Sequence, residues 1–306
     1  MMSITTRSLA RSRAFAVSGS AVILALALAA CGSSDDPSMS GMHHGHKPSA
    51  SASASQDSST GDMPDMARAA DGNGLADNKD GYRLASPDTT LKAGKPTPYR
   101  FVITDPDGTA VTDFALDQTK RMHFYAIRSD LTGFQHLHPA MASDGTWTAA
   151  LASLAPGSWR MFASFSPDSG SGKGKDFVMS RTVTVPGAAA RTPLPAVADS
   201  TQVDGYTLTV SGQPTAGTAQ PLAVRITKDG KAVTDLQPYL DTYAHLTAFH
   251  EGDAAFAHLH PTTSSGKGSS TLSFHAELGT PGDWRLFLQF RTGGKLHTAA
   301  LTLHAG

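Results

Sequence analysis

The sequence contains one segment twice, about 122 residues apart. Residues 111–139, "VTDFALDQTKRMHFYAIRSDLTGFQHLHP", align without a gap with residues 233–261, "VTDLQPYLDTYAHLTAFHEGDAAFAHLHP", and ten of the 29 positions are identical. Residues 156–165, "PGSWRMFASF", then recur as "PGDWRLFLQF" at 281–290. A period of this length is too long for a solenoid repeat and predicts two tandem copies of one domain.

Each copy has the pattern of an all-β domain. Short segments such as "YRFVIT", "HFYAIR" and "WRMFASF" are rich in β-branched and aromatic residues, and Asp-Gly turn signals separate several of them. No stretch in either copy shows a sustained helical period. About seven short strands in roughly 100 residues are typical of an immunoglobulin-like sandwich. We therefore predict two tandem immunoglobulin-like β-sandwich domains, at 81–187 and 203–306, joined by a linker at 188–202.

The first 30 residues have the composition of a secretory signal peptide. Three arginines precede an apolar run at 21–28 that is too short to cross a bilayer as a helix. The run ends in "LAAC", which resembles the lipobox of bacterial lipoproteins, in which the cysteine is acylated and becomes the new N-terminus. This resemblance implies a covalent lipid such as palmitate on Cys31, and a lipid-anchored protein at the extracytoplasmic face of the bacterial cell membrane. The alternative is an ordinary signal peptide with an incidental cysteine.

Cysteine content and charge exclude several classes of protein. Cys31 is the only cysteine in 306 residues, so a chain anchored there has neither an intramolecular disulfide nor a thiolate metal site. The formal net charge is −1, and removing the three arginines of the signal brings it to about −4. A chain with this acidic balance has no electrostatic footprint for nucleic acid, so we expect no nucleic-acid partner.

Residues 31–80 are dominated by Ser, Ala, Asp and Gly, which cannot build a core, so we predict a disordered tether. A flexible chain of about 50 residues spans roughly 40 Å, enough to hold the folded part clear of the membrane. Thioether and imidazole groups, which together suit copper, recur in this segment, although composition drift in an unconstrained linker would also produce them. The candidate auxiliary ligands are Met39, Met42, His43, His44, His46, Met63 and Met66.

The repeated segment carries three histidines in a fixed pattern, His-x12-His-x-His. Residues two apart in a strand point to the same face, so the last two histidines of each trio share a face. If their strand pairs as a hairpin with the preceding one, the first histidine lies opposite them, with Cβ atoms roughly 5 Å apart. Imidazoles at that spacing can bind one metal ion. The predicted ligands are His123, His136 and His138 in the first copy, and His245, His258 and His260 in the second.

Conservation of the trio between otherwise divergent copies favours a metal site over histidines retained by ancestry alone. All three histidines match, and they are the only histidines in the first copy. Phe134 and Phe256 lie on the histidine face, where they could form a wall of the site or pack at its rim. Four further histidines have no counterpart in the first copy, and we expect them at the surface: His250, His275, His297 and His304.

Three neutral imidazoles suit Cu(II), Zn(II) or Ni(II), and the Irving–Williams order favours copper. No cysteine completes a blue-copper set, so an electron-transfer site is not expected. Met122 precedes His123, but strand alternation sends its side chain to the other face, and the second copy has Ala244 there. The methionine- and histidine-containing tether favours copper as the bound ion, with zinc as the alternative.

The "H…FxHLHP" segment followed by "PGxWRxFxxF" resembles secreted bacterial domains of the YtkA-like type, which are often found with heavy-metal and copper-handling proteins. The resemblance covers most of both copies but not the tether. It implies an immunoglobulin-like fold and a metal-associated role. The family's typical chain carries one such domain, so the duplication leaves the number of sites open.

We therefore expect a membrane-anchored extracytoplasmic lipoprotein that binds copper and serves copper homeostasis or resistance, with a metal-trafficking protein as partner. One alternative is a metalloenzyme, such as a hydrolase or hydratase, because three histidines with an open position also form catalytic zinc sites. The carboxylates that recur, Asp113 and Asp235, lie ten residues before the first histidine of each trio, so we do not expect an enzyme. The other alternative is an interaction or structural module of the cell envelope that binds no metal.

Overall fold

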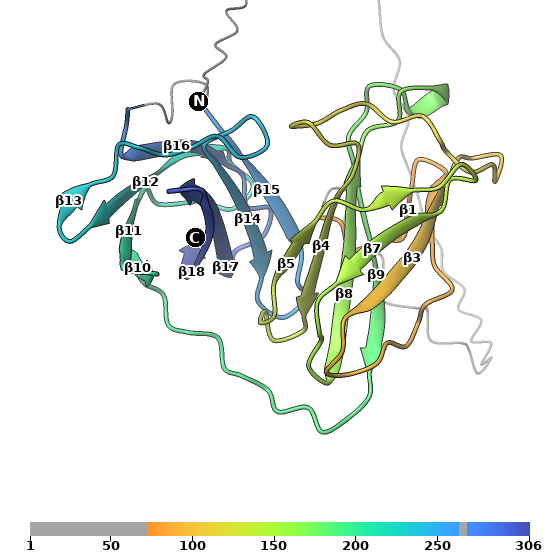
Figure 1. Ribbon diagram of the computed structural model, residues 1–306, viewed down its shortest axis with the longest axis horizontal. Helices are drawn as coiled ribbons and strands as arrows, with labels where there is room; N and C mark the ends of the chain where they lie inside the picture. Colours follow the sequence, from red (N-terminus) through yellow and green to blue (C-terminus); the bar gives the residue numbers. More distant parts are fainter. Residues whose placement is uncertain (1–72, 263–267) are drawn as a thin grey trace, which may run out of the picture. The chain divides into compact units, whose positions relative to one another are not determined.

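The structure is a computed structural model that describes residues 73–262 and 268–306 (Figure 1). The predicted signal peptide, Cys31 and all seven candidate ligands of the predicted tether lie outside the described residues. Within the part of the chain that is described, no helix has the length and apolar character to cross a membrane.

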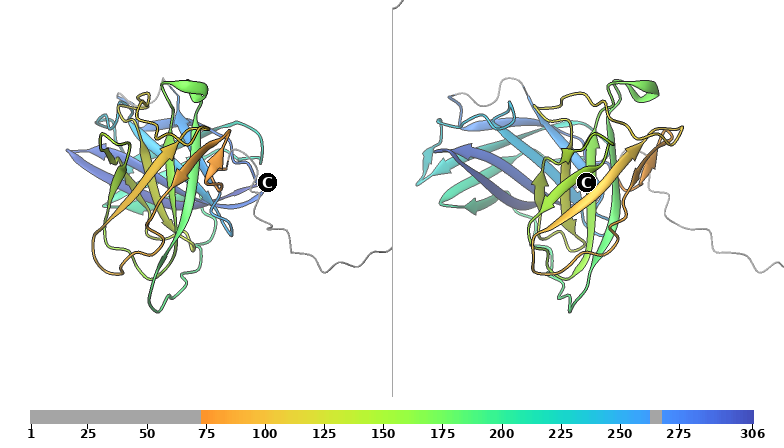
Figure 2. Two further views of the ribbon diagram at one scale, coloured as in Figure 1. Left: turned by 90° about the vertical axis from the view of Figure 1, so that its right-hand side faces the viewer. Right: turned by 45° about the vertical axis from the view of Figure 1, so that its right-hand side comes forward.

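The first repeat consists of two antiparallel sheets. One sheet has the strand order β1-β2-β3-β7-β6 and the other has the order β5-β4-β8-β9. A short 3-10 turn, η1 (Gly170–Gly172), lies in the connection between β8 and β9 at one end of this repeat (Figures 1 and 2). The strands are β1 (Asn78–Lys79), β2 (Tyr82–Ala85), β3 (Thr97–Thr104), β4 (His123–Arg128), β5 (Gln135–Leu137), β6 (Ala140–Met141), β7 (Trp147–Leu151), β8 (Gly157–Phe165) and β9 (Phe177–Val185).

The second repeat follows the same order, but its strands form one continuous path, β10-β11-β12-β16-β15-β14-β17-β18, with β13 beside β12. The path is continuous because β15 pairs with both β14 and β16. In the first repeat the equivalent segment is divided into β5 and β6 at His138 and Pro139. The strands are β10 (Ser200–Val203), β11 (Tyr206–Ser211), β12 (Gln220–Lys228), β13 (Lys231–Ala232), β14 (Ala244–His250), β15 (Phe256–Pro261), β16 (Thr271–Ala276), β17 (Gly282–Thr292) and β18 (Lys295–Ala305).

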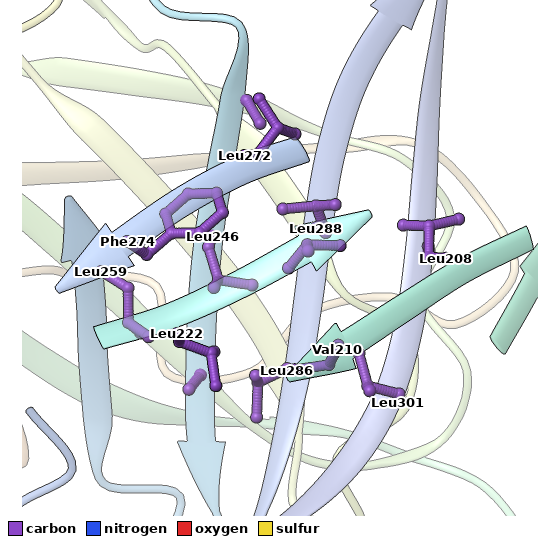
Figure 3. Packing of buried hydrophobic residues seen from close by; sticks show 14 of the residues in the cluster. Leu208, Val210, Leu222, Leu246, Leu259, Leu272, Phe274, Leu286, Leu288 and Leu301 are labelled. Atoms are coloured by element: carbon purple, nitrogen blue, oxygen red, sulfur yellow. The ribbon is translucent and has the colours of Figure 1, made fainter. Parts of the chain in front are cut away.

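Each repeat has its own apolar core between its layers, and the predicted all-β immunoglobulin-like class is confirmed. Strands of both repeats alternate buried and exposed residues, as the period of two requires. Leucines and Phe274 of the second repeat meet between its strands in Figure 3. Trp159 and Trp284 are fully buried at equivalent positions, and their indole N–H groups donate to the carbonyl oxygens of Ala155 and Thr280 at 2.8 and 3.0 Å. The same tryptophan anchor therefore closes both cores.

A third apolar cluster joins the two repeats. Strand β4 is buried on both faces: Phe124 and Ala126 pack in the core of the first repeat, whereas Tyr125 and Ile127 point the other way. That outer face packs against the outer face of the second repeat. The buried members of this inter-repeat cluster are Tyr125, Ile127, Leu131, Phe162, Phe249, Ala254, Phe256 and Phe287.

The first strand of the first repeat, β1, lies before the predicted boundary at residue 81. Residues 73–80, assigned to the tether by composition, pack on the folded domain and include β1. The carbonyl of Asn73 accepts the backbone N–H of Phe256, and the carbonyl of Leu75 accepts a bond from the Arg160 guanidinium at 2.9 Å. Composition could not reveal this, because backbone carbonyl groups carry these contacts.

The connection between the repeats is held by a buried ion pair. Arg128 and Asp130 form a salt bridge, and the Asp130 carboxylate also accepts the backbone N–H of Thr192 at 2.9 Å. Partial burial raises the pKa of Asp130, but the bonds from Arg128, Thr132 and Thr192 outweigh that effect and hold the pKa well below its ordinary value. The predicted linker, 188–202, is thus tied to the first repeat, and β10 begins within it at Ser200.

Candidate metal centre

Strand pairing brings His123, His136 and His138 together. Phe124 pairs with Leu137 and Tyr125 with His136, so the register continues to place His123 opposite His138. Leu137 points into the core, as alternation predicts, and Pro139 follows directly after the last histidine. One nitrogen from each of the three rings can be chosen so that all three lie within 4.8 Å of one another. Among the described residues, these three histidines are the one group with this property.

The spacing of the rings fits ligands of a single ion. Imidazole nitrogens bind metal at about 2 Å, so two imidazoles in tetrahedral positions have ring centroids about 5 Å apart. The centroid distances are 5.4 Å for His123 and His136, 5.1 Å for His123 and His138, and 4.8 Å for His136 and His138. The spacing of the three ring centroids is therefore close to that of three imidazoles bound to one tetrahedral ion.

Hydrogen bonds to oxygen acceptors determine which nitrogen of two rings faces the centre. Nε2–H of His123 donates to the carbonyl oxygen of Asp117 at 3.1 Å. Nδ1–H of His136 donates to Oε1 of Gln289 at 2.7 Å. A neutral imidazole has one N–H, so Nδ1 of His123 and Nε2 of His136 each carry a lone pair. These two nitrogens lie 3.1 Å apart and face each other.

With these tautomers the two lone pairs repel unless a cation lies between them, whereas with a proton on one of the two nitrogens the contact is an ordinary hydrogen bond. Two nitrogens bound to one tetrahedral ion are about 3.3 Å apart, close to the separation observed. In metal sites, a ligating histidine usually donates its outer N–H to an oxygen acceptor such as a backbone carbonyl, which fixes the orientation of the ring. The third ring, His138, has its Nε2 buried without a hydrogen-bond partner among the described residues.

A strained turn supplies the carbonyl that orients His123. The turn joins Asp117 to Lys120, and its two central residues have left-handed backbone angles, with φ of 44° at Gln118 and 70° at Thr119. This conformation costs side-chain-bearing residues roughly 1–2 kcal/mol each. Because neither residue is Gly or Asn, the sequence contains no signal for the turn.

Burial keeps the three imidazoles neutral. Loss of solvent lowers the pKa of His123 and lowers that of His138 to about 3. Burial also lowers the pKa of His136 well below its ordinary value; the bond to Gln289 opposes this, and the neighbouring histidines reinforce it. All three are therefore uncharged near pH 7, the form in which imidazole binds metal ions.

Aromatic side chains cover one side of the cluster, in which His123 is buried and His136 and His138 are half-buried. Tyr125 is fully buried and stacks on the His136 ring, with centroids 4.4 Å apart and planes inclined by 18°. Phe134 stacks on Phe287 of the second repeat, and Phe256 lies 5.1 Å from the Tyr125 ring. The phenylalanines predicted for the histidine face therefore pack between the repeats, next to the site.

The second trio is described only in part. His245 occupies the position equivalent to His123, and its Nε2 donates to the carbonyl of Tyr239 at 3.1 Å, from an equivalent turn with positive φ at its two central residues. Its Nδ1 is buried and has no hydrogen-bond partner in the described part of the chain. Burial lowers its pKa to about 4. His258 and His260 lie on β15 in the matching register, but their side chains are outside the described residues.

The remaining histidines differ from one another in their surroundings. His297 was expected at the surface but is 5% exposed, because its ring packs between Tyr206 and Phe290 and its Nδ1 bonds to Asp204 at 2.7 Å. His304 is exposed and bonds to a neighbouring aspartate, and His275 is exposed on β16. His297 on β18 acquires its aromatic neighbours through tertiary packing, which the sequence alone does not show.

Gln289 is the site residue that sequence reasoning missed. It lies 153 positions from His136 in the chain. Its counterpart in the first copy, from the alignment of "PGSWRMFASF" with "PGDWRLFLQF", is Ser164. Because the two copies have different residues at this position, comparing them could not identify Gln289 as a site residue.

Comparisons with solved structures return β-rich proteins with low similarity. The Escherichia coli adhesin FdeC is 19% identical, with a TM-score of 0.24, over 76% of this chain and 65% of that one. A Salmonella alpha-2-macroglobulin is 13% identical, with a TM-score of 0.25, over 76% of this chain and 15% of that one. Yersinia pseudotuberculosis InvD is 12% identical, with a TM-score of 0.24, over 74% of this chain and 57% of that one. The chain thus spans less than two thirds of each of these proteins, and no curated protein matches it.

The comparison with protein families is more specific. One family model matches residues 77–185 and again residues 201–306, so it covers both repeats and most of the chain. The comparisons lend no support to the expected link with YtkA-like domains or with copper, which remains a proposal. The protein belongs to the family described as "Domain of unknown function (DUF8832)", of which it carries two tandem copies.

Proposed function

We propose that this protein binds a transition-metal ion at the bacterial cell envelope through His123, His136 and His138. One observation carries the proposal: one nitrogen from each of the three rings lies within 4.8 Å of the other two, while the outer nitrogens of His123 and His136 are bonded to oxygen acceptors. A bound cation removes the repulsion between the two lone pairs, and the third imidazole supplies a further ligand.

Copper is the ion that the ligand chemistry favours. The site offers neutral imidazoles and no thiolate, a set that suits Cu(II) and Zn(II), and copper binds such sites more tightly in the Irving–Williams order. The methionines and histidines of the tether, such as Met42 and His43, would capture copper ions loosely before the folded site holds them. Zinc is the alternative ion for the same three ligands.

The location follows from the N-terminal signal and Cys31. A lipid on this cysteine would anchor the protein at the extracytoplasmic face of the membrane, with the metal site held away from the surface by the tether. A binding protein in this position serves metal homeostasis or resistance by taking up ions outside the cell and passing them to a trafficking partner.

We propose binding rather than catalysis. The recurring carboxylates Asp113 and Asp235 are both exposed, and the carboxylate of Asp117 lies 3.9 Å from Nε2 of His123. That nitrogen faces away from the other two rings, so Asp117 is not positioned as a general base for water on a bound ion.

Metal titration tests the proposal. The parent protein is the full chain with His43, His44 and His46 replaced by alanine, which removes the histidines of the tether. We expect the parent to bind Cu(II) or Zn(II) tightly by calorimetry, and His136→Ala to weaken that binding at least about 100-fold, more than the loss of a second-shell partner would.

The matched control is His304→Ala, which removes an exposed histidine from the second repeat and should leave binding unchanged. Equal uptake by the parent and by folded His136→Ala would refute the site. Restoring the tether histidines should add weaker metal binding to the titration without changing the affinity of the tight site.

A further inference from the structure

We infer that the second repeat completes the metal site of the first, with Gln289 as a positioning residue and His245 as a fourth ligand. The inference rests on the proposed function and changes its stoichiometry. The sequence predicts three histidine ligands in each repeat and leaves the number of sites open, whereas the geometry points to one tight site that both repeats build.

Gln289 holds His136 in the orientation that binding requires. The residue lies on β17, is 6% exposed, and accepts the Nδ1–H of His136 at 2.7 Å, while its amide nitrogen donates to Oγ1 of Thr298 at 3.3 Å. In this arrangement both ends of the amide have partners. The amide presents its oxygen to the imidazole, which leaves the other nitrogen of His136 to the ion.

The same amide can accommodate the metal-free protein. Rotation through 180° presents its NH2 group to Nδ1 of His136 and its oxygen to the Thr298 hydroxyl. His136 then carries its proton on Nε2 and donates it to Nδ1 of His123 as an ordinary hydrogen bond. Metal binding displaces this proton, and the amide of the second repeat turns to match, so occupancy of the site is linked to the contact between the repeats.

His245 lies next to the trio. Its ring centroid is 5.6 Å from that of His136 and 6.3 Å from that of His123. Rings bound to one tetrahedral ion are about 5 Å apart, and the His245 nitrogens lie outside the group that converges within 4.8 Å, so the His245 ring has to move towards the trio to take the fourth position. Its Nε2 is already bonded to the Tyr239 carbonyl, and its buried Nδ1 is the nitrogen left for the ion.

The first repeat does not offer the same groups in return. The counterpart of Gln289 is Ser164, whose hydroxyl is two bonds closer to the backbone and cannot extend as far as a carboxamide. The partner of His136 across the β4–β5 pair is Tyr125, which stacks on it, whereas the equivalent residue of β14 is Thr247. The two copies have therefore diverged at the residues that surround the histidines, and the site is asymmetric.

Variants of Gln289 test its positioning role in the parent with the tether histidines replaced. Gln289→Leu retains the volume but removes the acceptor, and should weaken Cu(II) or Zn(II) binding by about 10–100-fold, as loss of a second-shell partner does. Gln289→Glu retains an acceptor oxygen and should restore tight binding, a rescue that a packing role would not produce. Ser164→Ala is the matched control in the first repeat and should bind like the parent.

His245 is tested in two ways. His245→Ala should weaken the single tight site by tenfold or more and change the nitrogen hyperfine pattern of bound Cu(II). In the parent, 15N NMR should show that Nδ1 of His245 shifts when one equivalent of Zn(II) is added, which needs no variant and so is independent of any folding defect.

Two tight ions per chain, together with a His245→Ala variant that loses one ion and binds the other with parental affinity and spectrum, would overturn the inference while leaving the proposed function intact. A Zn(II) titration that shifts the His136 signals but not those of His245 would do the same. A parent that binds neither ion would refute the proposed function itself.

Discussion

The packing between the repeats leads to a quantitative prediction for Phe249→Ala. Phe249 lies on β14 on the face that points away from the core of its own repeat, and it is 0% exposed. It contacts the rings of Phe134 and Phe162 from the first repeat, with centroids 6.1 and 5.5 Å away, and those of Phe256 and Phe287. In an isolated second repeat the first two contacts would be lost and this face would meet water.

The loss of stability in Phe249→Ala distinguishes repeats that pack against each other from repeats that do not. A buried Phe→Ala substitution lowers the free energy of unfolding by about 3–5 kcal/mol, whereas a surface substitution changes it by about 0.5 kcal/mol or less. For a folded region of this size, each 1 kcal/mol shifts Tm by about 2–4 °C, so we expect Phe249→Ala to lower Tm by about 10 °C.

Denaturation of the metal-free protein, followed by calorimetry and by tryptophan fluorescence, measures the change. The control is Leu116→Ala, which replaces a side chain that is 69% exposed and should shift Tm by no more than about 2 °C. A loss of less than about 1 kcal/mol for Phe249→Ala would show that the repeats do not bury this face against each other, and the reasoning for a shared metal site would fail with it.

Three other outcomes are expected. Gly133→Ala should destabilise the protein by about 2–4 kcal/mol in urea denaturation, because φ is +72° there and a Cβ would overlap the Trp159 ring. In the control Gly108→Ala, φ is +81° and the space is open, so only the strain of the left-handed backbone should lower the free energy of unfolding. Equal losses in the two variants would contradict this account. The metal-free protein should lose stability as the pH falls from about 6.5 towards 4, because burial lowers the pKa of folded His245 to about 4 while the unfolded chain already takes up the proton. Unfolding free energies that are the same at pH 7 and pH 5 would be inconsistent with neutral buried imidazoles. Asp130→Asn removes the charge that binds the linker and should lower stability by about 1–3 kcal/mol, with faster amide exchange at Thr192; unchanged exchange there would mean that the ion pair does not hold the linker.

Much of the first-repeat site could be predicted because it depends on local geometry. A strand places His136 and His138 on one face, and a short hairpin places His123 opposite them, so the period of two and the turn together determine the cluster. The internal repeat supported the same prediction, since all three histidines recur among residues that otherwise changed. The all-β class followed from equally local signals, short strand-forming segments between turns.

The surroundings of the histidines depended on contacts between distant parts of the chain. Gln289 reaches His136 only because the outer faces of the two repeats pack together, and the alternation of apolar residues within a strand does not reveal what covers its outer face. The carbonyl of Asp117 is positioned by a turn that contains neither Gly nor Asn, so no turn signal marked it.

The sequence by itself determined the two sandwiches and the convergence of three imidazoles, since strand period and hairpin register are properties of neighbouring residues. Only the tertiary structure decided which ring nitrogens face the centre and that the second repeat lies against it. The physical reason is that hydrogen-bond acceptors and solvent exclusion come from residues far apart in the chain, and packing alone brings them to the site.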